Sequence, residues 1–106
     1  MHQRMIKHKF KAKPVDCDGK HFASKLEHRY YEHLKLRQKA GNILFFLMQV
    51  PIAIPGGKYV VDFVEFLSNG HVVFTEVKGF HTPLGKLKIK QVEELYPFEI
   101  NLVTKI

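Results

Sequence analysis

The sequence predicts an α/β protein in which a central mixed β-sheet is flanked by helices and the core elements follow in the order α-β-β-β-α-β. Two observations support this prediction. Apolar residues recur at helical spacing after two capping signals, at Ser24 and at Thr82-Pro83. The segments between and after these helices are rich in apolar and β-branched residues and are separated by Gly, Asn and Pro turns. The chain contains no internal repeat and no linker.

The size and charge of the chain indicate which classes of partner it is expected to bind. With 106 residues, 45% hydrophobic and 12% aromatic, it is long enough for one packed domain. It has 17 Lys and Arg against 10 Asp and Glu, a net charge of +7. A surface of this charge favours polyanions, nucleic acid above all, and plain solubility is the alternative explanation.

A single cysteine, Cys17, excludes an intrachain disulfide, as is usual in a reducing compartment. No segment approaches the roughly 18 apolar residues that cross a membrane. The basic N-terminus is not followed by the apolar core of an export signal. We therefore expect a cytoplasmic protein, in the host cytoplasm if the chain is phage-encoded.

Residues 1–13 form a basic arm before the predicted domain, residues 14–106. Its lysines occupy alternate positions, which would place their ammonium groups on one side of an extended segment. Such an arm can grip the phosphates of nucleic acid, and a solvated chain end is the alternative. The basic residues concerned are Arg4, Lys7, Lys9, Lys11 and Lys13.

The first half of the domain contains a short hairpin, a helix and a strand. Asp18-Gly19 is a two-residue hairpin signal. A helix opens with Ser24 to Glu27, runs to about Ala40 and stops at Gly41-Asn42. Its buried stripe is expected to comprise Leu26, Tyr30, Leu34 and the stem of Arg37. The apolar segment Ile43 to Ile54 is predicted to be a central strand that ends at Pro55-Gly56-Gly57.

The second half contains two strands, a helix and a last strand. The strands, Tyr59 to Leu67 and His71 to Lys78, are joined by Ser68-Asn69-Gly70. A second helix begins at Thr82-Pro83 and ends at Tyr96-Pro97, and a last strand spans Phe98 to Val103. The apolar positions of this helix are Leu84, Leu87, Ile89, Val92 and Leu95.

The hairpin register decides whether Asp62 and Glu76 share a face. A two-residue Asn69-Gly70 turn would pair Asp62 with Val77 and direct the two carboxylates to opposite faces. A three-residue loop with a left-handed Gly70 pairs Leu67 with His71 instead. Asp62 then lies across from Glu76, and Val60 across from Lys78. We predict the three-residue register, in which the other face pairs Val61 with Val77, Phe63 with Thr75 and Glu65 with Val73.

This register predicts a metal site. Glu76 and Lys78 point to the same side of their strand because strand side chains alternate. Two carboxylates facing each other in a sheet that is covered on both sides are unfavourable unless a cation binds them or one is protonated. Glu27 borders the buried stripe of its helix and can reach inward, whereas Glu32 points to solvent. The alternative role for Glu27 is a capping box with Ser24.

Other residue types give weaker signals. His28 and His33 do not form a His-Glu-x-x-His zinc motif. Cys17 lacks the context of a catalytic nucleophile and is expected to be structural. His81, just after the strand that carries Lys78, is a minor candidate for a phosphate contact.

The arrangement of a helical Glu27, Asp62 on the second strand, and Glu76 and Lys78 on the third resembles the PD-(D/E)XK restriction-endonuclease-like superfamily. Within it, the chain looks most like small phage-encoded nucleases related to archaeal-type Holliday junction resolvases. The resemblance covers roughly Phe22 to Val103, and Val61 stands where the namesake motif has a proline. The matching stretches are Phe22 to Glu27, Tyr59 to Phe63 and Thr75 to Phe80.

The resemblance implies Mg²⁺-dependent phosphodiester hydrolysis, with Mn²⁺ expected to substitute. Asp62, Glu76 and the carbonyl of Val77 would hold the metal, and Glu27 would complete the site directly or through water. Lys78 would orient the attacking water or stabilise the transition state. Supporting residues are expected at Gln49 and Ser24. Lys86, Lys88 and Lys90 are candidates for phosphate contacts, and a solvated helix face is their alternative.

The expected function is that of an endonuclease acting on branched DNA, a Holliday junction resolvase of DNA recombination. A homodimer is expected because two symmetric nicks need two active sites. Two alternatives remain: a PD-(D/E)XK nuclease acting on non-junction DNA, and a non-catalytic basic domain that binds nucleic acid. Neither predicted helix is a basic amphipath with large exposed aromatic residues, so no membrane partner is expected.

Overall fold

A computed structural model describes residues 14–106, which form a mixed α/β fold of two helices, a two-stranded sheet and a four-stranded sheet. The predicted basic arm, with its five basic residues, lies outside the described residues. The predicted fold class is confirmed, and each predicted helix and strand is present. The elements are β1 (Val15–Cys17), β2 (Lys20–Phe22), α2 (Lys25–Lys39), β3 (Ile43–Ile54), β4 (Gly57–Leu67), β5 (Val72–Val77), α3 (Pro83–Leu95) and β6 (Ile100–Val103).

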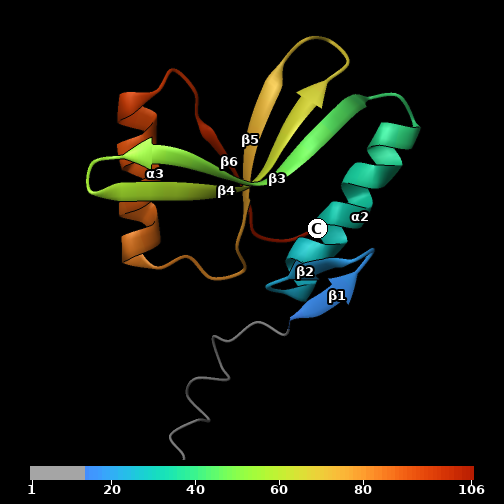
Figure 1. Cartoon of the computed structure of the whole chain (residues 1–106), viewed down its shortest axis with the longest axis horizontal. Helices are drawn as coiled ribbons and strands as arrows, with labels where there is room; N and C mark the ends of the chain where they lie inside the picture. Colours follow the sequence, from blue (N-terminus) through green and yellow to red (C-terminus); the bar gives the residue numbers. More distant parts are fainter. Residues whose placement is uncertain (1–13) are drawn as a thin grey trace, which may run out of the picture.

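The four-stranded sheet has the order β3-β4-β5-β6. β3, β4 and β5 are antiparallel neighbours, and β6 runs parallel to β5. A parallel pair needs a long crossover, which α3 provides here. The two helices lie on opposite sides of β5 and β6, with α2 beside the β1–β2 hairpin (Figure 1). The sheet is therefore central and flanked by helices, as predicted.

Local sequence explains the first elements. Asp18 and Gly19 both have positive φ, 54° and 74°, and Cys17 pairs with Lys20. This is the backbone of the two-residue hairpin turn that Asp-Gly favours. The Ser24 hydroxyl accepts the Glu27 amide at 3.0 Å and so caps α2. At the other end Gly41 has φ 90°, and the amide of Asn42 donates to the Arg37 carbonyl, which ends the helix.

The structure corrects the predicted position of Ile43–Ile54. This strand, β3, lies at the edge of the sheet and not at its centre. One of its faces is half-buried and the other is exposed, and Leu44 retains 62% of its accessible surface. Its apolar composition suggested burial on both faces, but composition does not report how many neighbouring strands a segment has. Phe45 and Leu47 are also exposed.

The helix α3 begins where the sequence predicts, with the Thr82 hydroxyl accepting the Gly85 amide at 3.0 Å. Of its apolar side chains, Val92 is buried and Ile89 half-buried against the sheet. Leu84, Leu87 and Leu95 are exposed. The helix therefore contacts the sheet along a narrow stripe.

The predicted three-residue register of the β4–β5 hairpin is confirmed. Phe63 pairs with Thr75 and Glu65 with Val73. The Leu67 amide donates to the His71 carbonyl at 2.9 Å, and Gly70 has φ 93°. The loop therefore contains the left-handed glycine that its sequence suggests.

Strand pairing stops one position before the predicted carboxylate pair. The last paired residues are Phe63 and Thr75, and from there β4 and β5 separate (Figure 1). The predicted cross-strand pairs of Val60, Val61 and Asp62 are therefore not formed in the sheet. The Asp62 carboxylate accepts the Val77 amide at 2.8 Å and so replaces a backbone partner. We call the point where β4 and β5 separate, next to Asp62, the fork.

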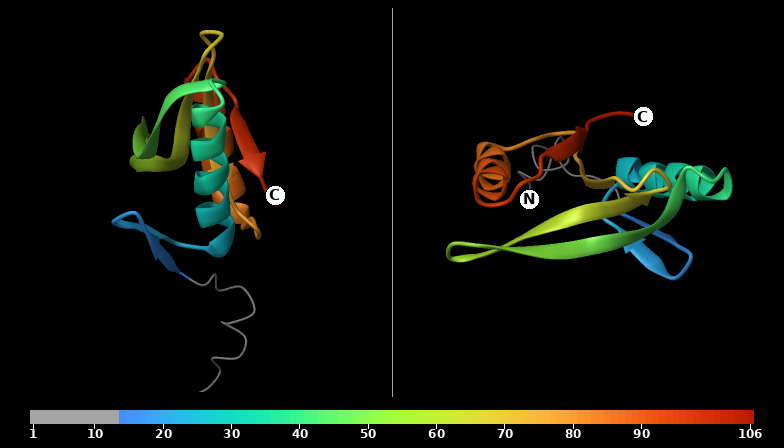
Figure 2. Two further views of the ribbon diagram at one scale, coloured as in Figure 1. Left: turned by 90° about the vertical axis from the view of Figure 1, so that its right-hand side faces the viewer. Right: turned by 90° about the horizontal axis from the view of Figure 1, so that it is seen from above.

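The β3–β4 hairpin curves past the fork and contacts both helices (Figure 2). Within β3, Gln49 has φ 53°, which is unusual for a residue other than glycine. The core is correspondingly divided into two clusters. One packs on α2 and contains Phe22, Tyr30, Tyr31, Leu34, Ile43, Phe63 and Val77. The other packs on α3 and contains Tyr59, Val61, Val64 and Val92.

One acid of the sheet is fully satisfied inside the protein. Glu65, 1% exposed, accepts hydrogen bonds from Tyr30 at 2.5 Å and Thr75 at 2.7 Å. Arg37 completes the set with an ion pair at 3.2 Å. A buried carboxylate with this many partners is a structural element and not a free ligand.

Across residues 14–106, neither helix combines the length and the apolar character that spanning a bilayer requires.

Candidate active site

The fork brings together the carboxylates that the sequence predicts. Glu27 comes from the first turn of α2, Asp62 from β4 at the point of separation, and Glu76 from β5. With Gln49 of β3 and Lys78, which follows β5, they line a cleft of about 410 Å³. Three different elements therefore supply the acids, and the twist of the sheet places them on one surface. His21, Ala23 and Val60 complete the lining.

Glu27 takes part in capping its helix and also faces the cleft. Its backbone amide donates to Ser24, and its carboxylate accepts the Ala23 amide at 2.8 Å, so it takes part in capping α2. The other carboxylate oxygen faces the cleft and accepts from Gln49 at 3.3 Å. The side chain is only 5% exposed. Capping thus orients the carboxylate towards the fork.

Gln49 connects two of the acids. Its side-chain amide lies 3.3 Å from the Glu27 carboxylate and 3.3 Å from that of Asp62. The backbone of Gln49 is left-handed at this position, which is unusual within a strand. The prediction that Gln49 supports the site agrees with these contacts. Ser24 also contributes, through its bond to Glu27.

Glu76 is held by a residue that the sequence analysis did not single out. The hydroxyl of Tyr59 donates to the Glu76 carboxylate at 2.8 Å, and both side chains are buried. Tyr59 occupies the part of β4 that lies beyond the fork. The sequence around Tyr59 does not indicate this contact, because Glu76 lies 17 positions further along the chain.

Burial and the repulsion between the carboxylates disfavour the ionised forms of these acids. The pKa of Glu27 is raised from 4.5 to about 7, first by burial and then by the charge of Asp62. The pKa of Glu76 is raised for the same two reasons, against the opposing effect of its bond to Tyr59. A proton or a cation would relieve this repulsion.

Lys78 lies next to the acids without forming an ion pair with them. It is exposed, and within the described range no contact of 4 Å or less joins its ammonium group to Glu76. It also lines the neighbouring part of the cleft, about 480 Å³, together with Glu27 and Asp62. The ammonium group therefore remains available to an anion.

Further basic residues lie at one end of this cleft. Lys58 and Lys88 line a depression of about 370 Å³ together with Glu76 and Lys78. Of the three lysines predicted on α3, only Lys88 lines it. Lys86 and Lys90 are exposed and lie elsewhere on the helix, because residues two apart project in different directions. The sequence analysis did not single out Lys58.

The described chain holds one compact group of potential metal ligands, and it lies outside the cleft. The ligand atoms of Cys17, His28 and Glu32 are all within 4.8 Å of one another. As predicted, Glu32 does not reach the cleft; its side chain keeps 45% of its accessible surface and lies beside Cys17 and His28 instead. The acids of the cleft are spread more widely, because Gln49 lies between Glu27 and Asp62 while Tyr59 holds Glu76.

The donors of the cleft nevertheless fit Mg²⁺. Mg²⁺ prefers oxygen ligands and is usually bound through one or two carboxylates while it keeps several waters. Asp62 and Glu76 offer such oxygens, and Glu27 lies close enough to Asp62 for the charge of Asp62 to raise the pKa of Glu27. A cation here would offset the repulsion that raises the pKa of Glu27 and of Glu76.

Comparison with known proteins gave one match. Neither the curated proteins nor the solved structures include one that matches this chain. A protein-family model, described as "Protein of unknown function (DUF1064)", matches residues 7–105, nearly the whole chain. The matched range contains every residue of the cleft described above. The chain belongs to this family, DUF1064.

Proposed function

We propose that this protein is a Mg²⁺-dependent endonuclease that hydrolyses phosphodiester bonds in branched DNA, with four-way junctions as the expected substrate. The observation that carries the proposal is the convergence of Glu27, Asp62, Glu76 and Lys78 at the fork. The resemblance of these residues to the PD-(D/E)XK superfamily supports it further.

Asp62 and Glu76 would hold the metal together with the Val77 carbonyl, and Glu27 would do so directly or through water. When bound, the ion would lower the pKa of a water molecule and neutralise charge on the scissile phosphate. Mn²⁺ is expected to substitute for Mg²⁺, because both accept oxygen ligands.

The protein's own groups orient the acids and stabilise the reacting phosphate. Gln49 positions Glu27 and Asp62, and Tyr59 positions Glu76. Lys78 lines the same cleft as these acids, and among the described residues it forms no ion pair. Its ammonium group would orient the attacking water or stabilise the charge that develops on the phosphate.

DNA binding would depend on the net charge of +7 and on the lysines at the end of the cleft. Lys58 and Lys88 are the described candidates for phosphate contacts, and the basic arm of residues 1–13 is a further one. Because a junction is cut at two symmetric positions, a homodimer is the expected active form.

The competing function is a non-catalytic nucleic-acid-binding domain with structural acids. In that case Lys78 would neutralise Glu76 in an ion pair, which would make a metal unnecessary. The exposed Lys78 ammonium does not approach Glu76 within 4 Å, and this favours the nuclease.

Cleavage of an end-labelled four-way junction and of a matched linear duplex tests the proposal. Both substrates are incubated with the full chain and with Glu76→Gln, in Mg²⁺ or in EDTA. Glu94→Gln serves as the matched control, because Glu94 is an exposed carboxylate on α3, outside the cleft. We expect paired nicks in the junction that require both Mg²⁺ and Glu76 and that Glu94→Gln retains.

Two other results would change the proposal. Cleavage of both substrates at similar rates would keep the nuclease and remove the preference for junctions. Tight, salt-sensitive binding without cleavage in Mg²⁺ or Mn²⁺ would favour the non-catalytic domain.

A further inference from the structure

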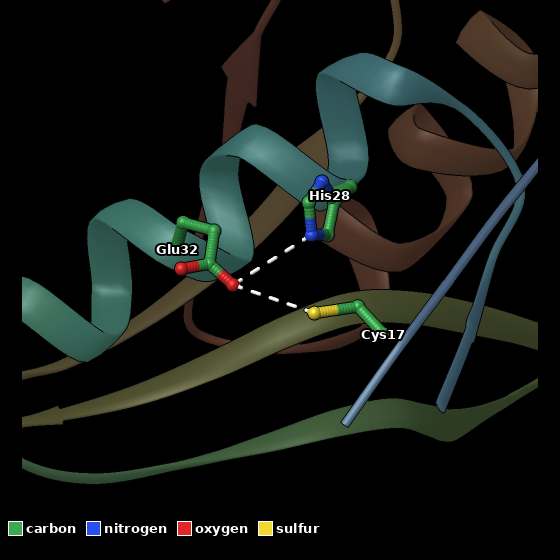
Figure 3. Close-up of side chains that lie close together, drawn as sticks. All are labelled: Cys17, His28 and Glu32. Atoms are coloured by element: carbon green, nitrogen blue, oxygen red, sulfur yellow. Dashed lines mark hydrogen bonds and ion pairs between the residues drawn. The ribbon is translucent and has the colours of Figure 1, made fainter. Parts of the chain in front are cut away.

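A second group of potential ligands lies where the β1–β2 hairpin packs on α2, and it does not contribute to the cleft (Figure 3). Cys17 is the last residue of β1, while His28 and Glu32 stand one turn apart on α2. The Glu32 carboxylate lies 3.6 Å from the Cys17 sulfur and 3.6 Å from Nε2 of His28. All three side chains point to a common centre (Figure 3).

These separations suit a tetrahedral transition-metal ion. Zn²⁺ binds Cys sulfur at about 2.3 Å and nitrogen or oxygen at about 2.0–2.2 Å, so its ligand atoms lie about 3.3–3.7 Å apart. The two distances to Glu32 fall within this range. The remaining pair, Cys17 and His28, is within 4.8 Å and would need only a small adjustment.

The state of His28 also points to a missing partner. Its Nε2 is buried and has no hydrogen-bond partner. The Glu32 carboxylate lies 3.6 Å from this nitrogen, within ion-pair range but too far for a hydrogen bond. The ring packs against Phe22, with centroids 5.4 Å apart, and this contact helps to orient the nitrogen.

One neighbouring cation has to be accommodated. The Lys35 ammonium group lies 3.4 Å from the same Glu32 oxygen, but it also makes a shorter ion pair, 2.6 Å, with Asp18. Lys35 can therefore keep its bond to Asp18 while Glu32 binds an ion. A thiolate, an imidazole and a carboxylate suit Zn²⁺ or Co²⁺ and not Mg²⁺, which prefers oxygen.

We propose that Cys17, His28 and Glu32 form a Zn²⁺-class metal site, separate from the carboxylate cleft, that fastens the β1–β2 hairpin to α2. Three protein ligands leave a fourth position for water. The hairpin leads directly into Ala23, whose amide holds Glu27. The ion would thus stabilise the segment that orients Glu27, whatever reaction the cleft catalyses.

Cobalt spectroscopy tests this site without any measurement of nuclease activity. The chelator-treated full chain is titrated with Co²⁺ in excess Mg²⁺, which would occupy the oxygen ligands of the cleft. Because Cys17 is the only cysteine, a thiolate-to-cobalt charge-transfer band identifies it as a ligand. We expect the band to saturate at one Co²⁺ per chain and to disappear on addition of Zn²⁺.

Substitution of each of the three proposed ligands tests whether it contributes to the charge-transfer band and to Co²⁺ binding. Cys17→Ser should abolish it, and His28→Gln and Glu32→Gln should weaken Co²⁺ binding at least about tenfold. His71→Gln is the matched control, because His71 is an exposed histidine in the β4–β5 loop, remote from the site. It should bind Co²⁺ as the unaltered chain does.

A second measurement applies if Cys17→Ser does not fold. Stoichiometric Zn²⁺ should slow the reaction of Cys17 with a thiol reagent in the unaltered chain and in His71→Gln, but not in His28→Gln. The site is overturned if no thiolate band appears at stoichiometric Co²⁺. It is also overturned if His28→Gln and Glu32→Gln leave the affinity unchanged. Neither result bears on Mg²⁺ binding in the cleft.

Discussion

The side-chain amide of Gln49 lies 3.3 Å from the carboxylate of Asp62, across the β3–β4 hairpin, at the position where the backbone of Gln49 is left-handed. Strand pairing between β4 and β5 ends beside the same residue, Asp62. The left-handed backbone of Gln49, the end of the β4–β5 pairing and the grouping of the acids therefore coincide. Strained backbone of this kind is retained where the surrounding structure requires it.

Substitutions of Gln49 can separate its backbone strain from its side-chain contacts. Gln49→Gly should be more stable than Gln49→Ala by about 0.5–1 kcal/mol, because left-handed backbone costs about 1–2 kcal/mol in residues other than glycine, and glycine loses about 0.5–1 kcal/mol in chain entropy. Urea unfolding measures this difference. At Leu47, an exposed position of the same strand without positive φ, alanine should be the more stable. Greater stability of alanine at both positions would contradict a strained Gln49.

Glu27 should make stability depend on pH. Its pKa in the folded protein, about 7, lies above the ordinary value of 4.5, so the native state binds more protons than the unfolded state between these values. The free energy of unfolding should therefore fall as pH rises from about 4.5 to 7, by on the order of 3 kcal/mol from this group. Thermal unfolding across this pH range measures the effect.

The variant Glu27→Gln isolates that contribution, since it removes the titration and keeps an oxygen that can accept the Ala23 amide. Its stability should decline less with pH than that of the unaltered chain, whereas Glu94→Gln should follow the unaltered chain. Mg²⁺ should reduce the decline in the unaltered chain, because the ion binds the deprotonated acids. Identical pH profiles for Glu27→Gln and the unaltered chain would contradict the raised pKa.

Tyr59→Phe tests whether the Tyr59 hydroxyl prepares Glu76 for a metal. Loss of the 2.8 Å hydrogen bond should raise the pKa of Glu76 further and leave its carboxylate less well oriented. Partners that orient a ligand typically change metal affinity or activity by about 10–100-fold. We expect cleavage at low Mg²⁺ to fall by such a factor and to recover at high Mg²⁺. An unchanged Mg²⁺ dependence would exclude this role.

Arg37→Leu tests the buried carboxylate Glu65, which lies away from the cleft. Removal of the 3.2 Å ion pair leaves a charge that is 1% exposed with only neutral donors. The cost should be about 2–3 kcal/mol of unfolding free energy. The double variant Arg37→Leu/Glu65→Gln should recover more than half of this loss, and cleavage should persist below the melting temperature. An equal loss in both variants would show that packing, and not charge, determines the effect.

The sequence predicted best those features that short-range chemistry determines. Asp18-Gly19, Ser24 with Glu27, Gly41-Asn42 and Thr82-Pro83 each specify a turn or a cap through neighbouring backbone groups. The three-residue β4–β5 loop followed from its glycine, and with it the pairing of Phe63 with Thr75 and Glu65 with Val73, although the strands separate before the predicted pair of Asp62 and Glu76. These local signals were enough to assemble the candidate site from elements far apart in the chain.

Features that depend on neighbours distant in the sequence were not predictable in the same way. The apolar residues of β3 suggested a central strand, but β3 lies at the edge of the sheet with β4 as its one neighbouring strand. Composition does not report how many strands pair with a segment. The contact between Tyr59 and Glu76 joins residues 17 positions apart, beyond the point where β4 and β5 pair, and no local signal encodes it. Cys17 and His28 belong to different elements, β1 and α2, so their spacing in the sequence does not form a recognisable metal-binding motif.

The fork has a mechanical consequence. All four strands of the sheet contribute residues to both hydrophobic clusters, the one against α2 and the one against α3, and the carboxylates lie at the seam between them. An ion that bound Glu27 of one half and Glu76 at the base of the other would act as a brace across this seam. Metal occupancy and the stiffness of the whole molecule would then be coupled, so that a filled site and a rigid protein favour each other.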